Sequence, residues 1–150
     1  MRVRLERRFH RANVETVLTS LLRLQLGTDM LLAAQILAAV VLLLHVYFVL
    51  LETVLYRSRG YKVFGIPKDQ MESRAAAMSN QGCYNGFLVA AIALGLCYPD
   101  PSIARAFMVY GLVCVVVAGI WGAVTVSKRI LFIQALPAAL ALIAFYLVKT

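Results

Sequence analysis

The chain has 150 residues, of which 62% are hydrophobic and only 15% are charged. A soluble domain would be about half apolar, so this composition indicates a multi-pass membrane protein instead. The formal net charge of +8 would suggest nucleic acid if the protein were soluble. Here the basic residues flank apolar blocks, which predicts a bilayer with anionic headgroups as the partner and no nucleic acid.

Residues 1–29 differ from the rest, and we separate them as a basic N-terminal extension from a membrane domain over 30–150. Three interpretations stay open. The extension is an amphipathic helix at the membrane surface, a targeting presequence, against which Glu6 and Glu15 count, or a segment upstream of a natural start at Met30. Five arginines precede an apolar helical face: Arg2, Arg4, Arg7, Arg8 and Arg11, then Val14, Val17, Leu18 and Leu21.

Four apolar blocks are long enough to cross about 30 Å of hydrocarbon, which requires roughly 20 helical residues. They cover residues 30–51, 80–98, 105–126 and 130–148. Their length and the lack of two-residue alternation argue against strands. The predicted fold is therefore all-α, a four-transmembrane-helix bundle with an additional N-terminal amphipathic segment. The three cysteines include no CxxC spacing and predict neither a disulfide framework nor a zinc site.

The connections between the blocks set the predicted topology. Residues 98–102 form a tight turn with two prolines, and 127–129 are so short that the third and fourth helices must form an antiparallel hairpin. The positive-inside rule places the long connection over 52–79 in the cytoplasm and both termini outside. The expected location is the inner membrane of a bacterium, or an organellar membrane if residues 1–29 are a targeting segment. The basic residues of the long connection are Arg57, Arg59, Lys62, Lys68 and Arg74.

Polar side chains inside apolar spans are unfavourable in lipid and therefore mark candidate sites. His45 lies within the first span and Glu52 at its cytoplasmic end, about 10.5 Å apart along one helix face. Each also has a purely structural interpretation. His45 could make an interhelical hydrogen bond that holds the bundle together. Glu52 could pair at the interface with one of three bases: Arg57, Lys128 or Arg129.

The second span opens with the octapeptide NQGCYNGF at 80–87. Gln81 and Asn85 are one turn apart with Tyr84 beside them, and a stripe of small residues runs about 100° away. Small residues let helix backbones approach closely, so we expect this stripe to dock against a matching stripe in the third span. The two stripes are Gly82, Gly86, Ala90 and Ala93, and Gly111, Ala118, Gly122 and Thr125.

The fourth span contains Gln134 and Pro137, and the proline removes the hydrogen bond to the Ile133 carbonyl and favours a bend. By depth, His45, Asn85 and Gln134 fall in one layer, one to two turns below the cytoplasmic boundary. The sequence thus predicts a polar pocket in the cytoplasmic half of the bundle. Its candidate residues are His45, Glu52, Asn80, Gln81, Tyr84, Asn85 and Gln134.

Five strings together resemble the small four-helix membrane family catalogued as domain of unknown function 1304. The strings are HVYFVLLETVLY (45–56), YKVFGI (61–66), NQGCYNGF (80–87), AGIWGAVTV (118–126) and ILFIQALPA (130–138). The resemblance begins near Met30 and implies a compact bundle in the cytoplasmic membrane, with no established activity. Its motifs fall on His45 with Glu52, on the octapeptide, on Gly119 with Gly122, and on Gln134 with Pro137. Phe48 stands where the family pattern has a tyrosine.

Three functional hypotheses follow. The first is a small-molecule or ion carrier, working as a homo-oligomer, in which the polar layer binds and Glu52 couples a proton. The second is an accessory subunit or assembly factor of a larger membrane complex. The third, an intramembrane enzyme, is disfavoured because one histidine is a poor metal-ligand set and no nucleophile triad or phosphate loop is present. We assign no catalytic residue, metal ligand or cofactor.

Overall fold

The computed structural model describes the backbone of residues 2–148 and the side chains of residues 15–148. The described backbone is all-α, with no strand. Its α-helices are α1 (Arg2–Glu52), α2 (Tyr61–Val63), α3 (Met71–Cys97), α4 (Pro101–Thr125) and α5 (Leu136–Leu147). Two π-helical turns, η1 (Tyr56–Gly60) and η3 (Leu131–Ala135), and a 3-10 turn, η2 (Lys68–Gln70), join them.

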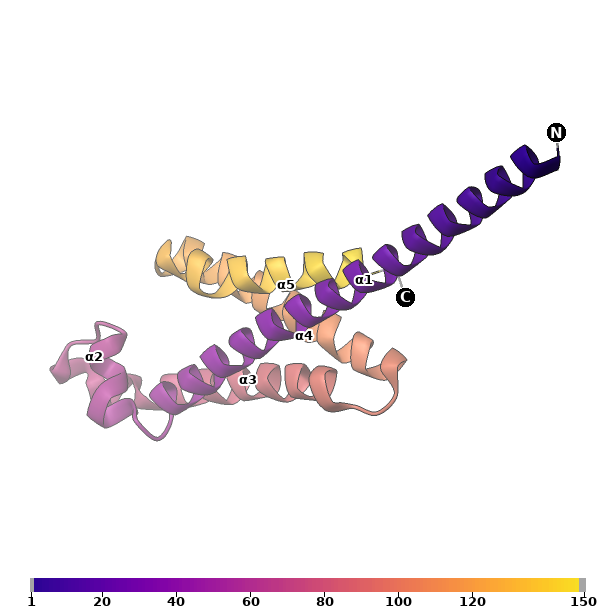
Figure 1. The fold of residues 1–150 in the computed structure, drawn as a ribbon. Helices are drawn as coiled ribbons and strands as arrows, with labels where there is room; N and C mark the ends of the chain where they lie inside the picture. Colours follow the sequence, from indigo (N-terminus) through magenta and orange to yellow (C-terminus); the bar gives the residue numbers. More distant parts are fainter. Residues whose placement is uncertain (1, 149–150) are drawn as a thin grey trace.

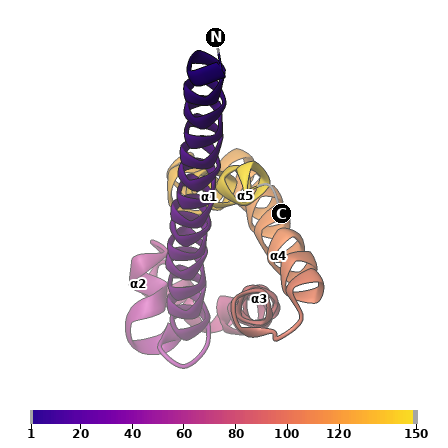
Figure 2. The same ribbon diagram turned by 45° about the vertical axis from the view of Figure 1, so that its right-hand side comes forward.

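The four long helices form a closed ring (Figures 1 and 2). α1 packs against α3 and α5, and α4 packs against the same two helices. Successive helices run in opposite directions, and the α4–α5 connection is the short hairpin that the sequence predicts. As a result, the end of α1, the start of α3 and the turn η3 all lie at the same end of the molecule.

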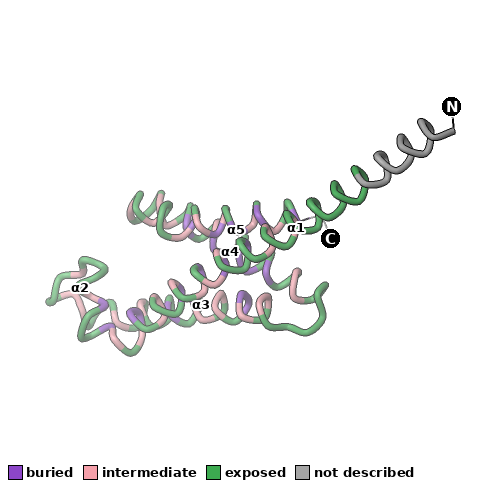
Figure 3. The backbone as a smooth tube through the Cα atoms, viewed as in Figure 1, coloured by how far each residue is buried: buried purple, intermediate pink, exposed green. Residues whose placement is uncertain are grey.

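Helix α1 is one continuous helix of 51 residues, so no break separates residues 2–29 from the first predicted span. The side chains of Arg2 to Arg11 and of Val14 lie outside the described residues. From Val17 to Leu26 the large apolar side chains are each more than half exposed, because this part of α1 projects beyond the other helices (Figure 3).

Two of the described helices are long and apolar enough to cross a membrane, Glu15–Glu52 and Pro101–Thr125. The apolar helix over Leu131–Leu147 is shorter. Helix α3 begins at Met71, nine residues before the apolar block at 80–98, because polar residues such as Glu72 and Arg74 are good helix formers that extend it.

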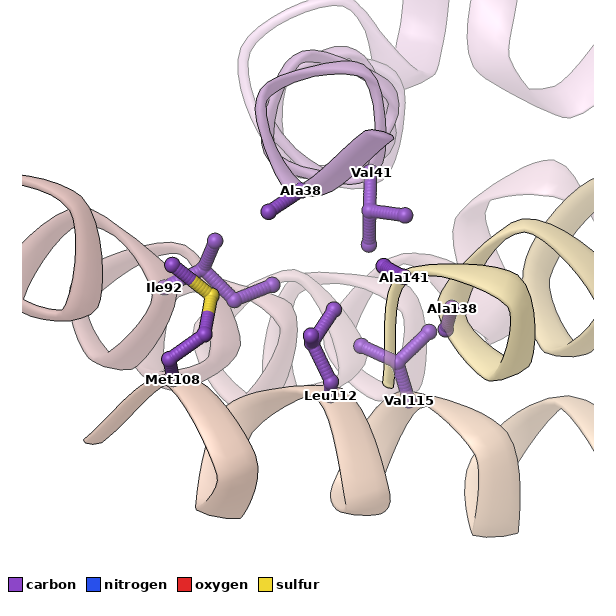
Figure 4. Close-up of a cluster of buried hydrophobic side chains, with 8 residues drawn as sticks. All are labelled: Ala38, Val41, Ile92, Met108, Leu112, Val115, Ala138 and Ala141. Carbon is purple, nitrogen blue, oxygen red and sulfur yellow. The ribbon is translucent and has the colours of Figure 1, made fainter. Parts of the chain in front are cut away.

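The core lies where α4 faces α1 across the ring. Met108, Leu112 and Val115 of α4 point toward Ala38 and Val41 of α1 (Figure 4). Ile92, Ala138 and Ala141 complete this cluster from the two flanking helices. Four of the eight members are alanine or valine on neighbouring faces of α1 and α5, and small side chains of this kind let helices pack closely by van der Waals contact.

Several glycines allow close approaches between helices. A Cβ at Gly95 would lie 2.8 Å from the Met108 backbone, and one at Gly119 would lie 2.7 Å from the Ala135 nitrogen. Gly111 lies against Ala91 and Ile92 of α3. Two of these three glycines, Gly95 and Gly119, are outside the stripes that the sequence predicts.

The predicted docking of one small stripe on the other is wrong in several members. A Cβ at Gly86 would have no atom of another element within 4 Å, and Ala118 is exposed. Gly82 faces α1 rather than α4, and Gly122 faces Ile130 in the hairpin. Gly82 and Gly86 point within about 40° of each other on α3, but of the two it is Gly82 that lies against the end of α1.

Helix ends follow the expected chemistry. The Asp100 carboxylate caps α4 by accepting hydrogen bonds from the Ser102 and Ile103 amides at 2.8 and 3.1 Å, and Pro101 begins the helix. A hydrogen bond from the Ser102 hydroxyl, together with these two amide bonds, holds the pKa of Asp100 below its usual range. In the fourth predicted span the backbone adapts to Pro137 with the π-turn η3, where the Leu136 amide bonds the Leu131 carbonyl.

Candidate functional site

The site begins with a buried carboxylate. Glu52 is the last residue of α1 and is 6% exposed, and Asn85 in α3 is equally buried. The Asn85 Nδ2 donates a hydrogen bond of 2.7 Å to Glu52 Oε2. A buried polar group needs such a partner because leaving it unpaired costs free energy. The two residues are 33 positions apart in the sequence, so the contact exists only in the folded chain.

Gly82 brings the two helices close enough for this bond. A Cβ at position 82 would lie 2.6 Å from Thr53 Cγ2 and 3.2 Å from Glu52 Cβ. Any side chain at this position would push α3 away from the end of α1. Because Asn85 is three residues later, about 60° around the helix, it faces the same neighbour. The glycine and the amide therefore act together at the α1–α3 contact.

An open cavity of about 610 Å³ lies beside the carboxylate. We call it the Glu52 cavity. One wall comes from α1 and the residues that follow it: Glu52, Thr53, Val54, Tyr56 and Arg57. The other wall is one face of α3 at helical spacing: Glu72, Ala75, Ala76 and Ser79. The volume falls within the range of about 300–1,000 Å³ typical of small-molecule sites.

Two contacts hold the walls together. Tyr56 is buried in the turn η1 and its hydroxyl donates to the Met71 carbonyl at 3.1 Å. Arg57 makes a two-pronged ion pair with Glu72, with hydrogen bonds of 2.9 and 3.0 Å. This pairing lowers the pKa of Glu72 and raises that of Arg57. Arg57 thus pairs with Glu72, and the expected interfacial pairing of Glu52 with a base is wrong.

His45 and Gln134 share no hydrogen bond with Asn85 in the described part of the chain. His45 is 1% exposed, and its Nδ1 lies 2.8 Å from the Val41 carbonyl in its own helix. Its ring meets Phe48 edge to face at 5.6 Å. Gln134 is half-buried in η3. Within the described residues no hydrogen bond links these two side chains to each other or to Asn85, and no group of three His, Cys, Asp or Glu side chains is placed to hold a metal.

Asn80, Gln81 and Tyr84 were predicted to face the pocket, and all three are exposed. Tyr84 is 54% exposed, and its ring lies beside that of Phe87 with 6.2 Å between the centroids. The reason is how α3 is rotated about its own axis relative to α1. Its contact with α1 centres between Gly82 and Asn85, and Tyr84 lies about 100° from Asn85 on the opposite side from Gly82.

Sequence reasoning missed most of the cavity wall. Ser79, Ala75 and Ala76 carry no charge and sit outside the apolar block, so nothing marked them. The signal that was available is the opposite charge of Arg57 and Glu72 within the long connection. An ion pair between these two residues would bring the start of α3 against the end of α1, and this indicates the second wall.

A family model described as protein of unknown function (DUF1304) matches residues 39–146. The chain belongs to this family. The match confirms the resemblance seen in the sequence, and the DUF1304 region contains the whole Glu52 cavity together with Asn85 and Gly82. Neither a search of curated proteins nor one of solved structures finds a match to this DUF1304 chain.

Proposed function

We propose that the chain is a multi-pass membrane protein whose four spans are the second half of α1, α3, α4, and η3 with α5. Helices α1 and α4 are long and apolar, and they lie opposite each other in the ring, with α3 and α5 between them. A bilayer crossed by the first pair therefore encloses the second pair. The end with Glu52 and the basic connection faces the cytoplasm, because Lys and Arg are retained there.

We propose further that the protein is a carrier for a small polar solute, bound in the Glu52 cavity. The observation that supports this is that Glu52, an acidic residue that is 94% buried between two helices, still lines an open cavity. Ionisable groups at membrane depth are unfavourable and are retained mainly where they bind or relay. A passive structural carboxylate needs no cavity beside it.

The residues have distinct roles in this proposal. Glu52 binds the solute or exchanges a proton against it, and Asn85 holds the carboxylate in position through Oε2. The Arg57–Glu72 pair lies at the mouth of the cavity and ties η1 to α3. One ring of four helices encloses little space for a pathway, so the working unit is a homo-oligomer in an anionic bilayer.

Uptake into proteoliposomes tests the carrier function. The full chain is reconstituted, exposed to a mixture of small amines, carboxylates and neutral amides, and the internal solutes are measured by mass spectrometry. We expect wild-type vesicles to take up at least one solute at least tenfold faster than Glu52→Gln vesicles. Glu15→Gln is the matched control, since Glu15 is exposed on the same helix. Equal uptake by wild type and Glu52→Gln for every solute would refute a carrier.

A second candidate function is an accessory subunit of a larger membrane complex. The projecting part of α1 favours it, because large apolar side chains are exposed there: Val17, Leu18, Leu21, Leu22, Leu24 and Leu26. Contiguous exposed apolar side chains are typical of protein or membrane contacts. Purification from native membranes in mild detergent distinguishes the two. A chain that elutes alone or with copies of itself would rule the subunit role out.

A further inference from the structure

Building on the proposed carrier function, we infer that the Glu52 cavity selects a small organic monocation, an alkylammonium ion, over anions and inorganic cations. The inference rests on which charges of the cavity are already satisfied and on what lines the remaining wall.

The charges of the cavity leave one carboxylate uncompensated. Three charged side chains line it, Glu52, Arg57 and Glu72. Arg57 and Glu72 neutralise each other because both glutamate oxygens accept from the guanidinium. The partner of Glu52 is the neutral amide of Asn85. With Glu52 ionised the wall carries a net charge of –1, which a single positive charge balances.

One oxygen of this carboxylate is open to the cavity. Asn85 bonds Oε2, and within the described residues Oε1 accepts no hydrogen bond. No buried side-chain oxygen or nitrogen of the described residues is without a partner, so Oε1 must be reachable from outside the protein. Since Glu52 lines the cavity and is otherwise buried, we place Oε1 at the cavity. A donor such as an ammonium N–H can therefore bond it directly.

Part of the cavity lining suits carbon rather than water. Val54, Ala75, Ala76 and Tyr56 are among the lining residues, and the Tyr56 hydroxyl is already bonded to Met71. Calcium needs six to eight oxygen ligands, more than the side chains of Glu52, Thr53 and Ser79 supply while both Glu72 oxygens are bonded to Arg57. Alkyl groups of an organic cation can pack on the apolar part, while an aromatic face attracts the cation itself.

Titration calorimetry on the full chain in detergent tests the ligand class independently of transport. The probes are n-butylammonium, butyrate, n-butanol and potassium ion, each corrected for titration into empty micelles. We expect n-butylammonium to bind at least tenfold more tightly than the other three. Glu52→Gln should weaken that binding at least tenfold, Glu52→Asp should restore part of it, and Glu15→Gln should leave it unchanged. Circular dichroism establishes that each variant is folded.

Two results would overturn the inference. The first is n-butylammonium binding that Glu52→Gln leaves intact. The second is preferred binding of butyrate that is lost in Arg57→Gln, because it would mean that an anion displaces Glu72 from Arg57. If n-butylammonium binds through Glu52 but is not taken up by proteoliposomes, the ligand class stands and the carrier function fails.

Discussion

Gly82 and Glu52 are in such close contact that a Cβ at position 82 would lie 3.2 Å from that of Glu52. This approach places α3 where Asn85 can bond the carboxylate at 2.7 Å. The missing side chain is thus as important to the site as the amide that makes the bond. The same contact fixes which face of α3 lines the cavity, because Ser79 and Ala75 precede Gly82 on that face.

Gly82→Ala should therefore destabilise the protein. The new methyl group would meet Thr53 Cγ2 at 2.6 Å, and overpacking of this kind costs about 1–3 kcal/mol. Gly86→Ala is the matched control, one turn away with nothing within 4 Å, and should be neutral or stabilising because alanine favours helix by about 1 kcal/mol over glycine. Thermal unfolding in detergent, followed by circular dichroism, measures both. Equal losses of thermal stability in the two variants would contradict the close approach of Gly82 to Thr53 and Glu52.

Asn85→Leu should leave the Glu52 carboxylate buried without its donor. The expected loss is about 1–3 kcal/mol in the free energy of unfolding. Combining it with Glu52→Leu should cost less than the sum of the single changes, because neither polar group is then left unpaired. Asn80→Leu, the same change at an exposed position of α3, should have little effect. A double-mutant cycle with no coupling would show that the bond contributes nothing to stability.

Gly119→Ala should separate α4 from η3. A Cβ at this position would lie 2.7 Å from the Ala135 nitrogen and 3.1 Å from its Cα, and backbone atoms cannot move aside as a side chain can. We expect the free energy of unfolding to fall by about 3 kcal/mol or more, the upper end of the usual cost of overpacking. Gly122→Ala meets only the Ile130 side chain, at 3.0 Å, and should cost clearly less. Denaturant midpoints of the two variants in the same micelles provide the comparison.

The Arg57–Glu72 pair should make a small contribution that depends on pH. Because the hydrogen bond from Arg57 lowers the pKa of Glu72, the contribution is present above the ordinary glutamate pKa and is lost as the pH falls through the lower folded value. Both side chains are about two-thirds exposed, so solvent screens the pair. In Arg57→Gln, the pKa of Glu72 should rise toward its ordinary value. Carbon-13 NMR of labelled glutamate measures it, and an unchanged pKa would show that the pair does not form.

The helices were predictable because apolar blocks of about 20 residues have few alternatives to helix. The residues at which the helices begin and end were less predictable. Neither Glu72 nor Arg74 stops a helix, and α3 therefore begins at Met71, well before its apolar block. For α1, residues 2–52 contain no proline, and the helix runs through the boundary expected near Met30.

The site was predictable only in part. Polarity marked Glu52 and Asn85, which are buried and bonded to each other, but the count of helical turns grouped Asn85 with His45 and Gln134 instead of with Glu52. The rotation of α3 decided the rest, and it is set by how closely Gly82 fits against Thr53 and Glu52, which no spacing in the sequence reveals. That rotation placed Tyr84 on the outer surface although it neighbours Asn85.

The continuity of α1 gives the molecule a mechanical property. At 1.5 Å per residue its 51 residues form a rod about 76 Å long, more than twice the thickness of about 30 Å of the hydrocarbon layer. A stiff rod converts a small tilt at one end into a large displacement at the other. Pivoting α1 by about 10° at Glu52 would move its far end by about 13 Å. In the topology that we propose, a change in packing beside the carboxylate would thus be amplified at the far end of α1.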